Sequence, residues 1–181
     1  MAQISNEITE NYISEVRSLL EEILKDTIAL KTNKDDLKQL THLIKNLHTI
    51  KGNSKMLGYT NIEKLAHATE DIFKNVKDSK IKISERLVKL VYVVIEKMHE
   101  CVSSIEKNGT DNRNIEIYLQ FCDKISAGEL IDIDSFIADI TRQNGNLLDE
   151  DDEDELLENL NDIQSIRIKL SRINEIISAF D

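Results

Sequence analysis

The sequence predicts an all-α protein, and three observations support this prediction. Hydrophobic residues make up 40% of the 181-residue chain, and most of them recur at spacings of three and four residues, as on one face of a helix. The chain contains no proline and only five glycines, the residues that most often interrupt helices. Aromatic residues account for only 4%, and Lys, Glu, Asp, Asn and Ser fill the positions between the apolar ones.

The first two helices are predicted from their apolar stripes. One helix is expected over residues 5–31, and a second from the break at "KTNKDD" to about residue 57. Asn33 or Asp35 is the expected N-cap of the second helix, because short polar side chains accept hydrogen bonds from free backbone amides. The expected buried positions are Ile8, Tyr12, Val16, Leu19, Leu20, Ile23, Leu24, Thr27, Ile28, Leu37, Leu40, Ile44, Leu47 and Ile50.

Three further helices are expected. The third covers residues 61–76, with Thr60 as its N-cap and Glu63 as the capping-box partner three residues on. Ser84 is the expected N-cap of a long fourth helix, and a weaker pattern predicts a fifth over about 113–126. Short loops between long helices favour antiparallel neighbours. The predicted architecture is therefore an up-and-down four-helix bundle with an appended fifth helix and a C-terminal helical extension.

The same patterns divide the chain into three parts. Residues 1–127 form the predicted helical domain. Residues 128–155 combine a short amphipathic segment, "IDIDSFIADI", with a flexible acidic linker. Residues 156–181 form a predicted amphipathic helix that has no core of its own, as expected for an interaction helix or the start of another domain.

Composition excludes several classes of partner. The net charge is −11, which argues against nucleic acid or an anionic membrane surface, although seven of the acidic residues form one run at 149–155. No run of 18 apolar residues and no basic, then apolar, leader occurs, so we expect no membrane insertion and a cytoplasmic location. Cys101 and Cys122 both fall in helical patterns and are expected to be buried free thiols.

The stretch "HTIKGNSKMLGY", residues 48–59, places a glycine inside a predicted helix. An interior glycine costs a helix roughly 1 kcal/mol relative to alanine, so the position needs a reason. Helical side chains lean toward the N-terminus, so a side chain at position 52 would project over His48. Gly52 therefore leaves the imidazole open to a bulky group, and Lys51 places an ammonium on the same face that suits a phosphoryl group.

A carboxylate partner for His48 is expected on the third helix. Imidazole is a nucleophile near neutral pH when its attacking nitrogen is unprotonated, and a carboxylate that accepts from the other ring N–H favours that state. In an antiparallel hairpin that turns near residues 58–60, Glu70 lies at a similar depth to His48 and is the candidate. His67 lies one turn before Glu70 on the same face, and Gly58 is the expected left-handed residue after the second helix.

These residues carry a family resemblance. The pattern H-x-x-K-G followed by a glycine six residues later resembles the histidine-phosphotransfer (HPt) motif; its residues here are His48, Lys51, Gly52 and Gly58. The next helix carries H-x-x-E at His67 and Glu70, and looks specifically like the N-terminal phosphotransfer domain of the chemotaxis histidine kinase CheA. The resemblance covers about residues 5–127.

The resemblance implies a helical bundle that acts as a covalent phosphoryl relay. His48 would accept phosphate from the ATP-binding kinase domain of CheA and pass it to an aspartate of a response regulator of the CheY or CheB type. Glu70 would hold the Nδ1–H tautomer and leave Nε2 as the acceptor, with Lys51 and His67 in support. ATP and Mg²⁺ are implied on the partner domains, whereas no cofactor or metal is expected on this chain.

The C-terminal stretch "QSIRIKLSRINEIISAFD" is similar to the start of the CheA dimerisation domain. This similarity implies self-association through residues 156–181 and an N-terminal fragment of a larger kinase. The sequence shows no glycine-rich nucleotide loop. We therefore expect the chain to be the phosphoacceptor part of a histidine kinase, and the catalysis of transfer to come from its partners.

Two alternatives without phosphotransfer remain open. A metal-binding bundle is suggested by Glu96 and His99, one Glu-x-x-His pair, and by the histidines at 42, 48 and 67; however, a di-iron bundle needs a second such pair, and the sequence has none. A scaffold whose helices bind partners is the other alternative, supported by the amphipathic pattern of residues 156–181 alone.

Overall fold

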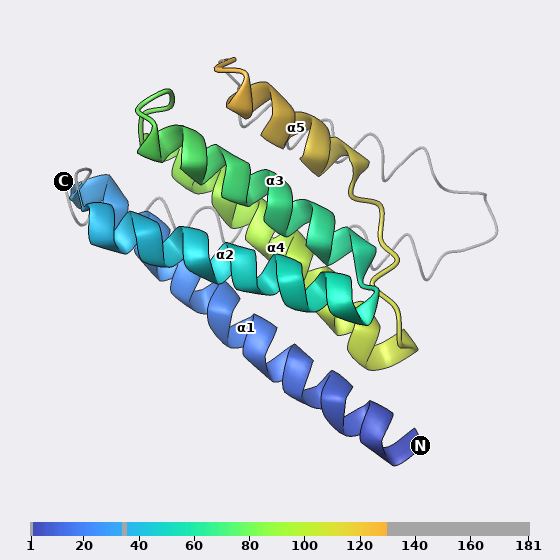
Figure 1. The fold of residues 1–181 in the computed structure, drawn as a ribbon. Helices are drawn as coiled ribbons and strands as arrows, with labels where there is room; N and C mark the ends of the chain where they lie inside the picture. The colour runs from blue at the N-terminus through green and yellow to red at the C-terminus, as the bar shows by residue number, and fades with distance from the viewer. Residues whose placement is uncertain (1, 34–35, 130–181) are drawn as a thin grey trace.

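The structure, a computed structural model, describes residues 2–33 and 36–129, which form five α-helices (Figure 1). The helices are α1 (Ala2–Thr32), α2 (Leu37–Leu57), α3 (Thr60–Lys77), α4 (Glu85–Asn108) and α5 (Glu116–Ser126). Every helix predicted within this part of the chain is present, with ends within a few residues of those expected. Of the predicted amphipathic segment and linker at 128–155, residues 130–155 lie outside the described residues, and so does the whole predicted C-terminal helix at 156–181.

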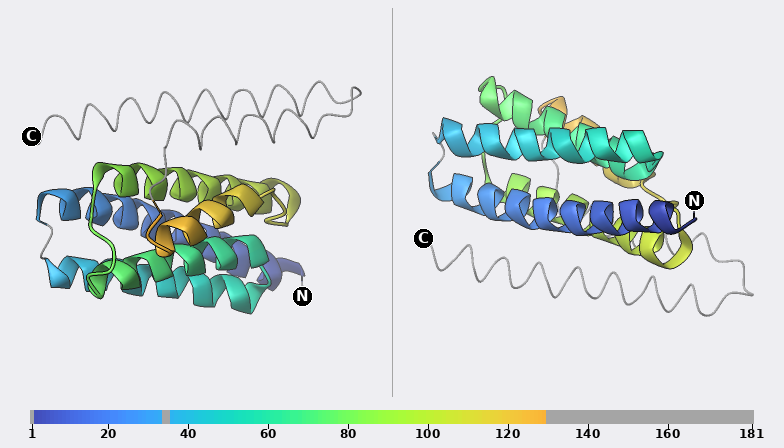
Figure 2. Two further views of the ribbon diagram at one scale, coloured as in Figure 1. Left: turned by 90° about the horizontal axis from the view of Figure 1, so that it is seen from above. Right: turned by 60° about the horizontal axis from the view of Figure 1, so that its bottom comes forward.

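The first four helices form an up-and-down bundle. α1 packs on α2, α2 on α3, α3 on α4, and α4 back on α1, so the four helices enclose one core. Consecutive helices run in opposite directions, and α5 packs along α3 (Figures 1 and 2). The predicted four-helix bundle with an appended fifth helix is confirmed.

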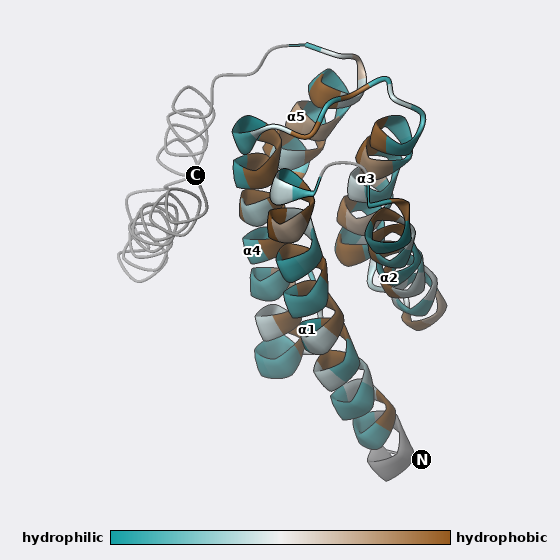
Figure 3. Ribbon diagram, turned by 90° about the vertical axis from the view of Figure 1, so that its left-hand side faces the viewer, coloured by the Kyte–Doolittle hydropathy of each residue, from teal (hydrophilic) through white to brown (hydrophobic). Residues whose placement is uncertain are grey.

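α4 lies deepest in the core. Residues 90–95 are all buried, so this helix is covered on more than one face. It can be so apolar because α1 packs on one side of it and α3 on another. The other helices carry both hydrophobic and hydrophilic residues along their length, as expected for amphipathic helices with one face toward water (Figure 3).

Two residues predicted to be buried are exposed. Ile8 exposes 48% of its surface and Leu37 exposes 63%. The N-terminal part of α1, which carries Ile8, extends past the ends of its neighbours in Figure 1, and Leu37 is the first residue of α2. A continuous apolar stripe therefore overestimates the core at helix ends, because the stripe does not record where the neighbouring helix stops.

The start of α4 is capped as predicted, whereas the start of α2 is not. The Ser84 hydroxyl accepts a hydrogen bond from the Leu87 N–H at 3.3 Å. At α2 the predicted caps, Asn33 and Asp35, are wrong, because the N-cap is Asp36, whose carboxylate accepts from the backbone amides of Lys38 at 3.1 Å and Gln39 at 3.0 Å. Short polar residues crowd this connection, and composition alone does not select which one forms the cap.

The capping box predicted at Thr60 and Glu63 is also wrong. Thr60 is already the first residue of α3, and the residue before it makes no side-chain cap bond. Instead, the carboxylate of Asp111, in the connection between α4 and α5, accepts from the backbone N–H groups of Asn61 at 2.7 Å and Ile62 at 3.1 Å. A residue distant in sequence therefore satisfies the first turn of α3.

The two cysteines are buried free thiols, as predicted. Burial raises the pKa of Cys101 and of Cys122 to about 12, so both thiols are protonated at neutral pH.

Among the helices of the described residues, none has the length and hydropathy needed to cross a membrane.

We expect Asp111→Ala to lower the free energy of unfolding by about 1–2 kcal/mol, because two amides in the first turn of α3 lose their acceptor. Asp123→Ala, an exposed aspartate on α5, is the control and should change the same quantity by less than about 0.5 kcal/mol. Denaturant unfolding followed by circular dichroism measures both. Equal losses in the two variants would contradict the capping role.

Candidate functional site

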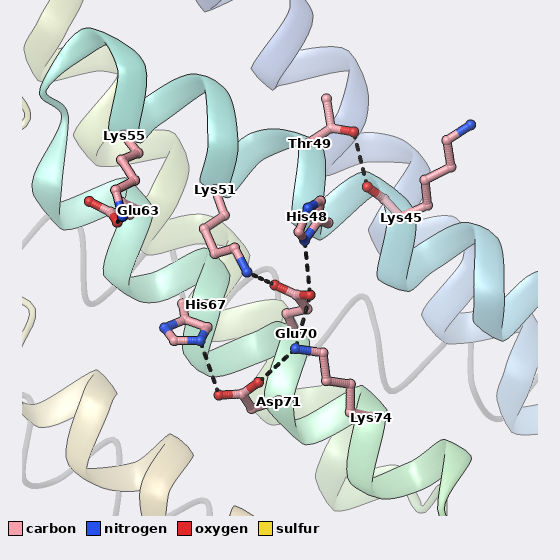
Figure 4. A network of polar contacts seen from close by, with 10 residues as sticks. All are labelled: Lys45, His48, Thr49, Lys51, Lys55, Glu63, His67, Glu70, Asp71 and Lys74. Atoms are coloured by element: carbon pink, nitrogen blue, oxygen red, sulfur yellow. Dashed lines mark hydrogen bonds and ion pairs between the residues drawn. The ribbon is translucent and has the colours of Figure 1, made fainter.

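The turn between α2 and α3 brings His48 and Glu70 together. Gly58 ends α2 at a φ of +81°, the left-handed conformation predicted for it, and α3 begins two residues later. His48 and Glu70 lie at the same height in this antiparallel helix pair, and His48 Nδ1 is 3.2 Å from Glu70 Oε1 (Figure 4). The His48 side chain is 68% exposed and that of Glu70 is 3% exposed. An accessible imidazole thus lies on a buried carboxylate.

The Glu70 carboxylate has two further partners. Lys51 Nζ donates to Oε2 at 2.6 Å, and Lys74 Nζ lies 3.0 Å from Oε1, the oxygen that also faces His48. Burial by itself would raise the carboxyl pKa, but the hydrogen bonds from Lys51, Lys74 and His48 outweigh it and lower the pKa of Glu70 from 4.5 to about 2. Glu70 is therefore ionised at neutral pH.

The ionised carboxylate determines which nitrogen of His48 carries hydrogen. A carboxylate only accepts hydrogen bonds, so the hydrogen in the contact with Glu70 belongs to Nδ1. A neutral imidazole has one N–H, and Nε2 therefore keeps its lone pair. Nε2 lies across the ring from Nδ1, and the side chain is largely exposed. The geometry presents a nucleophilic nitrogen at the protein surface.

No backbone strain and no close packing require glycine at position 52. Gly52 is not among the glycines with positive φ in the described residues, and it lies exposed in the middle of α2. A Cβ built at this position has nothing within 4 Å. The glycine therefore leaves free space next to His48, and the effect of this space on function stays a prediction.

The structure places His67 against Asp71. Its Nε2 lies 3.4 Å from Asp71 Oδ2, and Asp71 Oδ1 lies 3.1 Å from Lys74 Nζ (Figure 4). Because Lys74 also contacts Glu70, His67 is connected to the imidazole of His48 through three intermediate side chains. The predicted supporting role of His67 stays a prediction, and any such effect acts over an indirect route.

Lys74 and Asp71 were not predicted as members of the site. A signal was available for Lys74, because Glu70 and Lys74 are four residues apart on one helix, the spacing of a helical ion pair. The pattern around His48 indicates side chains that face His48 itself, whereas Lys74 is related to His48 only through Glu70.

A second histidine shows what distinguishes His48. His42, six residues earlier on α2, also places Nδ1 against a carboxylate, that of Asp26 at 2.8 Å. Its Nε2, however, lies 3.9 Å from a carboxylate oxygen of Glu22, which would repel an approaching anion. Four residues after His42 stands Asn46, whose side chain donates to Glu22, whereas a glycine follows His48 at that spacing. Of these two histidines of α2, His48 is the one whose surroundings are both cationic and open.

The metal-binding alternative has no cluster in the part of the chain that the structure describes. Across residues 2–33 and 36–129, no group of three or more His, Cys, Asp or Glu side chains is arranged to hold a metal ion. Glu96 and His99, the single Glu-x-x-His pair, lie in α4.

A comparison with protein families matches the Hpt domain to residues 7–108, more than half of the chain. The chain belongs to the Hpt domain family. Among curated relatives, the sensor histidine kinase CheAY of Helicobacter pylori is 30% identical over 108 residues, which cover 60% of this chain and 13% of that protein. The chemotaxis protein CheA of Bacillus subtilis is 22% identical over 110 residues, 61% of this chain and 16% of that protein. The resemblance to CheA is confirmed, and this Hpt chain matches only a small part of each relative.

Two solved structures share the Hpt fold. One is the phosphorylated P1 domain of CheA3 in complex with CheY6 from R. sphaeroides, with a TM-score of 0.60, 21% identity, and coverage of 67% of this chain and 96% of that chain. The other is a solution structure of the histidine phosphotransfer domain of CheA, with a TM-score of 0.61, 23% identity, and coverage of 66% and 91%. The start of a dimerisation domain at 156–181 stays a prediction.

We expect the contribution of Glu70 to stability to fall in acid. A carboxyl group whose pKa is lowered by folding stabilises the folded state above its unfolded pKa, here 4.5, and this stabilisation is lost as the pH falls through the folded pKa of about 2. The difference in free energy of unfolding between wild type and Glu70→Gln should therefore be largest at neutral pH and shrink below pH 4.5. Unfolding at several pH values measures it, with the exposed Glu21→Gln as control. A difference that stays constant down to pH 2 would argue against the lowered pKa.

Proposed function

We propose that this chain is a phosphoryl relay in two-component chemotaxis signalling, with His48 as the residue that accepts the phosphoryl group and passes it on. The observation that carries the proposal is the contact of His48 Nδ1 with ionised Glu70, because in the neutral ring it places the hydrogen on Nδ1 and leaves the lone pair on Nε2 of an exposed side chain. Membership of the Hpt family and similarity to CheA proteins support this class of reaction.

The first transfer is an attack by the Nε2 lone pair on the γ-phosphorus of ATP. The N–P bond forms as the P–O bond to the departing ADP breaks. The ring keeps its Nδ1 hydrogen and gains positive charge, and the carboxylate of Glu70 stabilises this charge through the hydrogen bond already in place. No proton has to leave His48 during this step.

The second transfer reverses the change at the ring. A carboxylate oxygen of an aspartate on the response regulator attacks the phosphorus, the N–P bond breaks, and neutral imidazole returns. The regulator would be of the CheY or CheB type and would supply its own Mg²⁺. A structural neighbour of this chain was solved in complex with CheY6, which supports a regulator as partner.

The remaining components belong to other domains in this proposal. ATP would be held by a CheA-type kinase domain, and this chain would be its substrate and the carrier of the phosphoryl group, with no cofactor of its own. A cytoplasmic location suits these partners. Self-association through residues 156–181 is part of the proposal, and it rests on the similarity of that stretch to the start of the CheA dimerisation domain.

Phosphorylation by a CheA kinase core with radiolabelled ATP tests the proposal. We expect label on the wild-type chain and none on His48→Gln. The matched control is His42→Gln, which removes another exposed histidine of α2, one that faces the Asp26 carboxylate on α1, and it should be labelled at the wild-type rate. Label that is labile in acid and stable in alkali identifies phosphohistidine. Label on His48→Gln would overturn the assignment of His48 as the phosphoacceptor. If the wild-type chain takes up no phosphate from either a kinase core or a small phosphodonor, the phosphoryl-relay function is overturned.

Gly52→Leu should slow labelling of His48 by at least about tenfold, because the leucine side chain leans toward the N-terminus and covers the imidazole. Gly52→Ala is the control; its Cβ meets nothing within 4 Å, so the labelling rate should stay within about twofold while helix stability rises by up to about 1 kcal/mol. Labelling rates and thermal unfolding of the three proteins separate the two effects. Wild-type labelling of Gly52→Leu would remove the need for open space.

A further inference from the structure

The single ammonium group of Lys51 has two possible anionic partners, the Glu70 carboxylate and a phosphoryl group on His48. Its Nζ lies 2.6 Å from Glu70 Oε2, and the side chain is only 21% exposed. In the proposed function, the same ammonium neutralises the phosphoryl group on His48. Leaving a buried carboxylate without a cation is strongly unfavourable. Lys51 turns toward the phosphoryl group most readily if a second ammonium joins the phosphorylated ring of His48 in pairing the Glu70 charge.

Lys74 is positioned to be that second cation. Its Nζ lies 3.0 Å from Glu70 Oε1 and 3.1 Å from Asp71 Oδ1. Both contacts lie within α3, at the helical spacings of four and three residues, so they do not depend on the approach of a partner. The oxygen that Lys74 contacts is the one that faces His48 Nδ1, across the ring from Nε2. Lys74 is thus on the side of the site away from the reacting nitrogen (Figure 4).

The neighbouring charged groups hold Lys74 in this position. Asp71 contacts Lys74 through Oδ1 and His67 through Oδ2, so the Lys74 ammonium lies between the carboxylates of Asp71 and Glu70. Figure 4 labels two further lysines of α2: the ammonium of Lys45 points away from Glu70, and that of Lys55 lies 3.8 Å from Glu63. The two lysines that contact Glu70 therefore lie on different helices: Lys51 is on α2, and Lys74 is on α3, the helix that carries Glu70 itself.

We propose that Lys74 is a positioning residue for phosphotransfer: it stays with Glu70 as a permanent counter-charge and thereby releases Lys51 to the phosphoryl group on His48. The inference rests on the proposed function and deepens it. On phosphorylation the Lys51 ammonium moves from Glu70 Oε2 to the phosphoryl oxygens with all its hydrogens. The carboxylate keeps Lys74 and the Nδ1–H of His48, so its charge stays paired throughout.

A double-mutant cycle with Lys51→Gln and Lys74→Gln tests the inference. Each single variant should lower the maximal rate of His48 labelling by roughly tenfold. Lys51→Gln removes the ammonium that neutralises the phosphoryl group, and Lys74→Gln removes the cation that lets Lys51 leave Glu70. The double variant should be no more than about twofold slower than either single variant, since both changes remove the same contribution. Effects that multiply to roughly a hundredfold would overturn the proposal.

Three controls separate positioning from folding and docking. Lys77→Gln removes the same charge one turn further along α3 and should leave the rate unchanged. Lys74→Arg retains the cation and should restore most of the wild-type rate. The concentration of this chain that gives half-maximal labelling should be the same for Lys74→Gln and wild type, whereas a changed value with an unchanged maximal rate would make Lys74 a docking residue and overturn the proposal.

A spectroscopic measurement follows the two ammonium groups directly. With ¹⁵N-labelled lysine, we expect the Nζ signal of Lys51 to shift when His48 is phosphorylated, and that of Lys74 to stay in place. A shift confined to Lys74 would overturn the inference while leaving His48 as the phosphoacceptor. A wild-type chain that takes up no phosphate on any residue would overturn the proposed function, and this inference with it.

Discussion

One buried negative charge organises this site. The Glu70 carboxylate, 3% exposed at the interface of α2 and α3, loses most of its hydration on folding and must recover that free energy from hydrogen bonds and cations. It does so with one imidazole and two ammonium groups, from both helices of the pair. The need to satisfy the carboxylate therefore fixes the orientation of His48 before any partner binds, which is the condition for a preorganised reacting group.

The core of the bundle holds these side chains in register. Each of the four side chains that meet at this carboxylate, those of His48, Lys51, Glu70 and Lys74, follows a buried residue in the chain. In the same order, the buried residues are Leu47, Ile50, Thr69 and Phe73. Each polar side chain thus starts from a backbone position that is fixed by packing one residue earlier. Precision at the surface follows from close packing beneath it, because well-packed interiors leave few alternative rotamers.

The bundle, the Ser84 cap of α4 and the pairing of His48 with Glu70 follow from local patterns in the sequence, whereas the caps of α2 and α3 and the outer contacts of the site do not. The period of the apolar residues determines the helices, and the length of the α2–α3 hairpin places residues 48 and 70 side by side. The cap of α3 comes from Asp111, fifty residues from the amide it accepts from, so no local pattern reveals it. Lys74 has the i,i+4 spacing of a helical ion pair with Glu70, but this spacing indicates a site contact only once Glu70 is known to be buried.

The long-range cap of α3 has a consequence for any excised fragment. The family match ends at residue 108, and Asp111 lies just beyond it, in the connection that leads to α5. A fragment trimmed to the matched boundary would keep His48, Lys51 and Glu70, and would still lose the acceptor for the first amides of the helix that carries Glu70. The autonomous unit of this protein is thus longer than the stretch that its motif defines, and it extends at least into the connection that follows α4.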